Sequence, residues 1–358
     1  MASNGATRIY AGAGHSVSGS GAKLRGGLYR RQAGDGEWQA LTAGLPQDVE
    51  VRAILLHPKN PGVIYVGTQD GPYRTTDGGD HWERLGFPDR SAVIWTLAIH
   101  PTRPNILYAG SAPVALYRSE DGGDNWKKLP AKSPALCEKD GFDTRTVRIV
   151  ADPGRPDDVY AALEVSGVIR SSDGGETWSD VSRTLMKFAD EPRYKSAIGG
   201  RACGDCEGML DSHALAISSA APGTAFLAIR MGLFRSDDRG ASWYDTQVGR
   251  FSPLTYCRDV IVSPHDPRTM YACLSQAAFS TAGSVYRSDN LGESWQRIDR
   301  GVKAESTVMA ISAHPRDPAR VYCVTRGGQV LGTEDAGASW RDYRLPKGVE
   351  DVYAVACA

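Results

Sequence analysis

The segment Asp211-Ser-His213 places a carboxylate and an imidazole two residues apart. On a β-strand, both side chains point to the same side, so the carboxylate can orient the imidazole or share a ligand with it. Such a pair, joined by Glu164, can perform general acid and base chemistry. His213, Asp211 and Glu164 are therefore the candidate catalytic residues. The alternative is an ion-pair network that only fixes how the strands pack.

A second chemical motif, Cys203-Gly-Asp-Cys206, ends seven residues before His213. A C-x-x-C with two more ligands can form a zinc tetrahedron, but the chain has no second C-x-x-C. A disulfide or two free thiols is the alternative for this pair. We therefore predict no cofactor, and we keep Cys203, Cys206 and His213 as the candidate ligands of a divalent metal.

The overall composition limits the class of protein. The 358 residues include 41 basic and 42 acidic side chains, a formal net charge of −1, so no global field favours nucleic acid or an anionic membrane as a partner. The longest apolar runs are shorter than the roughly 18 residues that a membrane helix needs. The N-terminus lacks the pattern of a secretory signal, and seven cysteines, an odd number, favour reduced thiols. We expect a cytoplasmic protein.

One motif recurs seven times and must position the candidate residues. In its clearest copy, Ser171 precedes Asp173-Gly-Gly-Glu-Thr-Trp178, and a turn of this kind joins two strands because glycine adopts positive φ. Successive copies are 44 to 65 residues apart, and about 45 residues is the length of a four-stranded propeller blade. The copies end at Trp38, Trp82, Trp126, Trp178, Trp243, Trp295 and Trp340.

These repeats predict an all-β fold, a single seven-bladed β-propeller domain over residues 1–358 with four-stranded antiparallel blades. The first repeat lacks an innermost strand, and Val352-Tyr-Ala-Val-Ala-Cys357 has the pattern of one. We therefore expect the C-terminal strand to pair into the N-terminal blade, which closes the ring and protects two sheet edges. The predicted blades are 8–45 with 351–357, 49–88, 92–130, 142–182, 209–249, 253–300 and 304–345, with an insertion at 183–208.

The sequence from Ser171 to Trp178 resembles the Asp-box, or bacterial neuraminidase repeat. Over nearly its whole length the chain is similar to the sialidase-like Asp-box β-propellers, which include sialidases, xyloglucan hydrolases, sortilin-type receptors and photosystem II assembly factors. The resemblance implies the fold. It leaves the chemistry open, because the superfamily spans enzymes and pure binders and this chain lacks the Phe/Tyr-Arg-Ile-Pro motif of sialidases.

Aligning the blades gives one equivalent position at the start of each innermost strand, at the mouth of the central channel. A purely structural ring is expected to repeat one residue type there, but this chain has Arg52, Trp95, Val147, His213, Arg258, Met309 and Tyr353. Two residues further along the strands the row is apolar, as in Ile54 and Leu97. The candidate ligand-binding residues at this mouth are Arg52, Trp95, Arg145, Arg230, Tyr256, Arg258, Arg326, Tyr353 and His15.

Two classes of function fit these residues. The first is an enzyme, a hydrolase or lyase that acts on a small polar or anionic molecule by histidine and carboxylate acid–base chemistry, with arginines that bind an anion bidentately. The alternative is a non-catalytic scaffold or assembly factor that binds a protein partner on the same face. A catalytic pocket should be deep with convergent ionisable groups, whereas a partner platform should be flat with exposed aromatic side chains.

Overall fold

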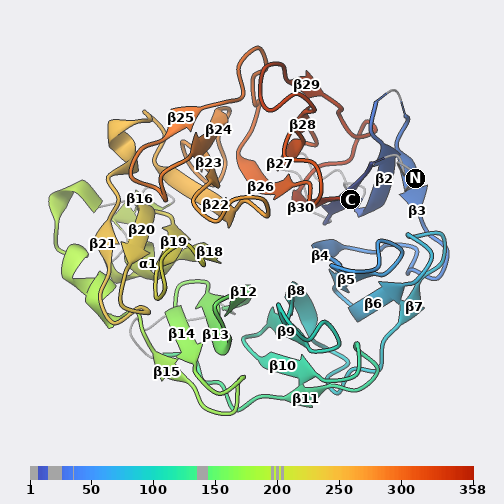
Figure 1. The fold of residues 1–358 in the computed structure, drawn as a ribbon, viewed down its shortest axis with the longest axis horizontal. Coiled ribbons are helices and arrows are strands. Elements are labelled where there is room, and N and C mark those ends of the chain that lie inside the picture. The colour runs from blue at the N-terminus through green and yellow to red at the C-terminus, as the bar shows by residue number, and fades with distance from the viewer. Residues whose placement is uncertain are drawn as a thin grey trace.

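The computed structural model describes residues 7–14, 26–34, 36–134, 144–194, 197–198, 201–202 and 205–358. Seven four-stranded antiparallel sheets stand around a central axis as blades (Figure 1), which confirms the predicted seven-bladed propeller. The innermost strands, which surround the axis, are β30 (Val352–Cys357), β4 (Val51–Leu56), β8 (Val93–Ile99), β12 (Thr146–Asp152), β18 (Ser212–Ile217), β22 (Tyr256–Val262) and β26 (Val308–Ala313).

The other strands follow outward in each blade. The second strands are β1 (Arg8–Ala13), β5 (Ile64–Thr68), β9 (Leu107–Ala112), β13 (Arg155–Leu163), β19 (Ala225–Ile229), β23 (Met270–Ser275) and β27 (Val321–Thr325). The third strands are β2 (Gly27–Gln32), β6 (Gly71–Thr75), β10 (Leu116–Ser119), β14 (Gly167–Ser171), β20 (Gly232–Ser236), β24 (Gly283–Ser288) and β28 (Val330–Thr333). The short outer strands are β3 (Gln39–Leu41), β7 (Glu83–Arg84), β11 (Lys127–Lys128), β15 (Ser179–Asp180), β21 (Tyr244–Asp245), β25 (Gln296–Arg297) and β29 (Arg341–Asp342).

The C-terminal strand β30 closes the ring, as predicted. It pairs with β1 in the first blade, with Tyr10 opposite Ala356 and Ala11 opposite Val355. The first blade therefore combines β1, β2 and β3 from the N-terminal part of the described chain with β30 from its C-terminal part.

The connection between the fourth and fifth blades holds most of the helical structure that the model describes. It contains η1 (Arg183–Phe188), η2 (Pro192–Tyr194), β16 (Ala197–Ile198), β17 (Arg201–Ala202) and α1 (Asp205–Leu210), and η3 (Val248–Arg250) follows the fifth blade. Phe188 and Tyr194 pack against Phe234 of β20, so this segment extends the core of the fifth blade. No helix in the described part of the chain is long and apolar enough to cross a membrane.

The repeated turns are self-contained hydrogen-bonded units, for which Ser171 to Trp178 is representative. The Ser171 hydroxyl donates to Asp173 Oδ1 at 2.6 Å and accepts from the Gly175 amide at 2.8 Å. Asp173 Oδ1 also accepts the Thr177 amide at 2.9 Å, and Trp178 Nε1 donates to the Gly175 carbonyl at 2.9 Å. Gly175 has a φ of 105°, a conformation that favours glycine. These contacts make the turn structural.

Second-strand tyrosines connect neighbouring blades through the same turns. The hydroxyl of Tyr10 donates to the carbonyl of Gly78 at 2.9 Å, and Tyr65 donates to Gly122 at 2.9 Å. Each bond runs from one blade to the turn of the next, and the buried clusters likewise mix residues of adjacent blades. The resulting ring is a rigid support for side chains at its centre.

Candidate binding site at the channel mouth

A β-bulge interrupts every innermost strand, and the extra residue is in each case the one that the blade alignment places at the mouth. The register skips one residue in each of the seven inner pairings, at Arg52, Trp95, Val147, His213, Arg258, Met309 and Tyr353. A bulge leaves its extra residue outside the ladder and re-aims the side chain. All seven line one central cavity of about 120 Å³.

His213 is deeply buried, although it lies at the mouth. Its Nδ1 is 2.8 Å from the carbonyl oxygen of Cys257, and because a carbonyl only accepts, Nδ1 carries the proton. Nε2 lies 3.3 Å from the hydroxyl of Tyr256 and 3.6 Å from Asp211 Oδ2. Only 2% of the His213 side chain is exposed. Both ring nitrogens are therefore occupied by the protein.

Asp211 is ionised in this cluster. Burial opposes its charge, but His213 and Arg230 hold the pKa of Asp211 below its usual range. Arg230 approaches Asp211 Oδ2 with Nε at 2.8 Å and Nη2 at 2.6 Å. The structure thus brings together His213, Asp211, Arg230 and Tyr256. The third candidate catalytic residue, Glu164, lies in the fourth blade and is held in an ion pair with Arg145 of the same blade, where Arg145 Nη2 donates to Glu164 Oε1 at 2.8 Å.

Arg52 is enclosed by two aromatic rings. Its guanidinium carbon lies 4.5 Å from the ring centre of Trp95 and 4.5 Å from that of Tyr353, and the two rings meet edge to face at 5.7 Å. Arg145 covers the Trp95 ring at 4.1 Å. Arg52 also forms an ion pair with Glu50. These contacts fix one side of the mouth as a rigid cationic and aromatic wall.

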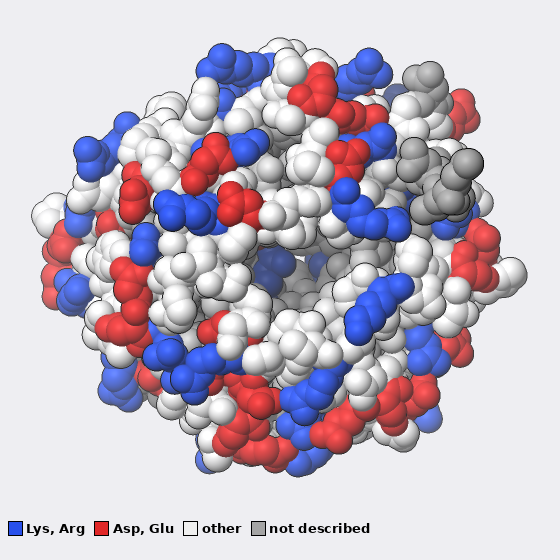
Figure 2. Space-filling view, in the orientation of Figure 1, with Lys and Arg blue, Asp and Glu red and all other residues white. Residues whose placement is uncertain are grey.

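The arginines at the mouth and in the channel are matched with carboxylates, with one exception. The matched pairs are Arg52 with Glu50, Arg145 with Glu164, Arg148 with Asp259, Arg230 with Asp211, and Arg326 with Asp351. The exception is Arg258, which lines the cavity, is half-buried and makes no hydrogen bond or ion pair with the described chain. Figure 2 looks into the central opening, where Lys or Arg side chains are visible in depth.

Arg258 is nevertheless firmly charged. Burial alone would lower its pKa, but Tyr256 and the carboxylates of Glu164 and Asp211 raise the pKa of Arg258 above its ordinary value. In the sixth blade Tyr256 stands where other blades have Glu50, Asp211 or Asp351, so the sixth blade supplies no carboxylate at this position. Among the residues that the structure describes, Arg258 therefore has no ion-pair partner, and its side chain lines the cavity.

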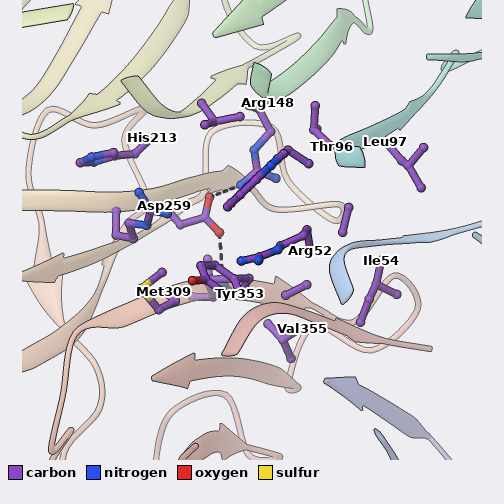
Figure 3. Close-up of a pocket in the computed structure, with 17 residues that line it drawn as sticks. Arg52, Ile54, Thr96, Leu97, Arg148, His213, Asp259, Met309, Tyr353 and Val355 are labelled. Carbon is purple, nitrogen blue, oxygen red and sulfur yellow. Dashed lines mark hydrogen bonds and ion pairs between the residues drawn. The ribbon is translucent and has the colours of Figure 1, made fainter. Parts of the chain in front are cut away.

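The pair of Arg148 and Asp259 lies deeper in the channel, and the sequence did not reveal it. Strict alternation along the strands turns both residues away from the channel, because they directly follow the mouth row. Because of the bulge, the residue that directly follows the mouth residue also faces the channel, so Arg148 and Asp259 line the same cavity as apolar Ile54 and Leu97 (Figure 3). A bulge at every mouth position is the signal that sequence reasoning lacked.

Other candidates are not placed at the site. His15 and Cys203 lie outside the described residues, and nothing is described of the Cys206 side chain. Within the described chain, no cluster of His, Cys, Asp and Glu side chains could hold a metal ion. Cys257, Cys273, Cys323 and Cys357 are buried free thiols.

Sequence comparisons match only part of the chain. The family described as Sortilin-Vps10 (sortilin, neurotensin receptor 3) matches residues 283–356. A vacuolar protein sorting/targeting protein 10 from Mycosarcoma maydis is 34% identical over 67 residues, which are 18% of this chain and 4% of that protein. The chain therefore spans a small fraction of the length of this curated relative.

Solved structures match the chain more completely. A GH74 xyloglucanase from Xanthomonas campestris has a TM-score of 0.63 at 18% identity, over 86% of this chain and 46% of the enzyme. YCF48 from Cyanidioschyzon merolae has a TM-score of 0.59 at 16% identity, over 87% of this chain and 90% of YCF48. YCF48 bound to D1 peptide has a TM-score of 0.55 at 16% identity, over 85% of both chains. Likeness at these identities shows the fold alone. With the family match, it supports the superfamily expected from the repeats, the BNR-type propellers, and no particular member of it.

Proposed function

We propose that the chain is a binding propeller whose channel mouth takes an anionic group of a ligand through Arg258. The observation that carries this proposal is that, within the described chain, Arg258 has no carboxylate partner in a mouth where the other arginines have one. A half-buried guanidinium is poorly hydrated and presents a planar fork to a carboxylate or similar anion. Free carboxylates for acid–base catalysis are not found among the described mouth residues, because those present are engaged by arginines.

The ligand that we favour is an acidic segment of a protein partner. A propeller of the same size, YCF48, has been solved with a peptide bound, and it aligns over 85% of both chains. The rim of this chain offers a partner an aromatic contact, because Phe279 stacks on Arg326 at 4.3 Å and is 79% exposed. We place this function in the cytoplasm, which the buried free thiols favour.

Titration with a fluorescein-labelled oligoglutamate peptide, followed by fluorescence anisotropy, tests the proposal. We expect binding to the wild-type chain and a loss of about tenfold or more in Arg258→Gln, since a hydrogen bond to a charged group contributes about 1.5–3 kcal/mol. Arg268→Gln is the matched control, because Arg268 belongs to the same blade but lies exposed in the turn after β22. If peptide binding weakens equally in both variants, the effect comes from the net charge of the protein, and Arg258 is not the binding site.

A hydrolase or lyase is the second candidate, because His213 contacts both Asp211 and Tyr256. The GH74 likeness makes xyloglucan a reasonable polysaccharide to test. Reducing ends released from xyloglucan by the wild-type chain, and not by His213→Asn, would favour this candidate over the binding proposal.

A further inference from the structure

The channel contains a carboxylate that already occupies one of its arginines. Asp259 lies on β22 of the sixth blade, and its Oδ1 accepts from Arg148 Nη2 of the fourth blade at 2.6 Å. Figure 3 shows this pair extending across the cavity. The fifth blade separates the two strands in sequence, so the pair crosses the channel instead of joining neighbours.

Asp259 is also fixed by the backbone. Its Oδ1 accepts the Val260 amide at 2.9 Å, and its Oδ2 accepts the Ile311 amide of the seventh blade at 3.0 Å. Only 2% of the Asp259 side chain is exposed, against 34% for Arg148. Three partners from three blades hold this carboxylate in place, so a ligand in the channel cannot readily displace it.

The charges around the cavity then leave room for one negative charge. Arg52 is matched by Glu50 and Arg148 by Asp259, so Arg258 is the available cation of the described lining. Glu164 of the fourth blade and Asp211 of the fifth blade act electrostatically on Arg258. A singly charged ligand neutralises Arg258, whereas a second negative charge meets these fixed carboxylates in a partly desolvated site.

We propose that the mouth selects a singly charged carboxylate, and that Asp259 sets this selectivity by occupying Arg148. The inference rests on the anion-binding function proposed above and names its ligand chemistry. Asp259 is a specificity-determining residue here, because it acts through Arg148 instead of touching the ligand. Its replacement by a neutral side chain frees a second arginine and makes room for a doubly charged anion.

Competition at constant ionic strength tests the inference, with acetate and sulfate displacing the labelled oligoglutamate peptide. In the wild-type chain we expect acetate to compete at a lower concentration than sulfate. In Asp259→Asn the midpoint for sulfate should fall by about tenfold, the effect of one added hydrogen bond between charged groups. Asp299→Asn is the matched control, because Asp299 is equally buried and bonds Arg297 at 2.7 Å away from the cavity.

Arg148→Gln provides a second route if Asp259→Asn does not fold, which a urea unfolding curve will show. It leaves Asp259 as an added negative charge, so we expect sulfate to weaken more than acetate. Comparing the binding of N-acetylglutamate amide with that of the peptide shows whether the natural ligand is a small free carboxylate or a side chain of a protein partner. Binding of either one supports the inference. An unchanged ratio of sulfate to acetate midpoints in both variants would overturn it, even if Arg258 proves essential. Absence of peptide binding by the wild-type chain would instead reject the proposed function.

Discussion

Replacement of His213 separates a structural histidine from a catalytic one. In His213→Ala the carbonyl of Cys257 loses a partner 2.8 Å away, and an unpaired buried acceptor costs about 1–3 kcal/mol. The variant also loses the packing of the imidazole on the Tyr256 ring, at 4.8 Å between centres, inside a site where the side chain is almost fully buried. Together these losses should lower the free energy of unfolding by about 3 kcal/mol.

His213→Asn is the matched variant, because its amide can donate to the same carbonyl while it cannot titrate. We expect it to recover about 1 kcal/mol or more of the loss. Urea unfolding followed by tryptophan fluorescence measures both. An Ala variant as stable as the wild-type chain would show that the imidazole is not held by these contacts, and it would strengthen the acid–base alternative.

Three further predictions concern the ring. Asp121 receives hydrogen bonds from the backbone and side chain of Asn125, which lower the pKa of Asp121 to about 2. Its contribution to stability is therefore present above about pH 4 and is lost as the pH falls toward 2. Asp121→Asn should make the urea unfolding midpoint depend less on pH across this window, and Asn290 already fills the same place in the sixth blade. Deletion of residues 352–358 should lower the thermal midpoint far more than Gln296→Ala in exposed β25, because it removes the inner strand of the first blade, and equal midpoints would contradict ring closure. Trp243→Ala should lower the free energy of unfolding by about 3–5 kcal/mol, because the Trp243 side chain is 1% exposed and its indole donates to the Val181 carbonyl at 2.7 Å. Trp178 is only half-buried, so Trp178→Ala should lose less stability, and equal losses in chemical denaturation would contradict this ranking.

The architecture was predictable because one physical unit is repeated. The Asp-x-Gly turn and its tryptophan depend on local hydrogen bonds, as between Ser171 and Asp173, so the same sequence pattern gives the same turn in each blade. Ring closure could also be predicted, because the first repeat lacks an inner strand and the C-terminal segment Val352–Cys357 supplies one that has no blade of its own. The local hydrogen bonds of the repeated turn and a count of the inner strands were therefore enough to predict the fold.

The site was only partly predictable, because its chemistry depends on register and pairing. The alignment found the mouth row, including Arg258 and His213, since every blade places one residue there. It missed Arg148 and Asp259, because the bulge at each mouth position also turns the next residue toward the channel. It also could not show that Arg258 has no carboxylate partner within the described residues, since such pairing depends on contacts such as Arg230 with Asp211 at the ends of neighbouring strands of the fifth blade.

Crystals of the wild-type chain and of Arg258→Gln, soaked in bromide and measured at the bromine absorption edge, test whether Arg258 binds an anion in the central cavity. Bromide is a singly charged anion that anomalous scattering locates without assumptions about the natural ligand. We expect a bromide in the central cavity beside the guanidinium of Arg258 in the wild-type chain, and none at this position in Arg258→Gln. A bromide that stays in the cavity of Arg258→Gln, or a wild-type cavity that binds none while other surface arginines do, would contradict it.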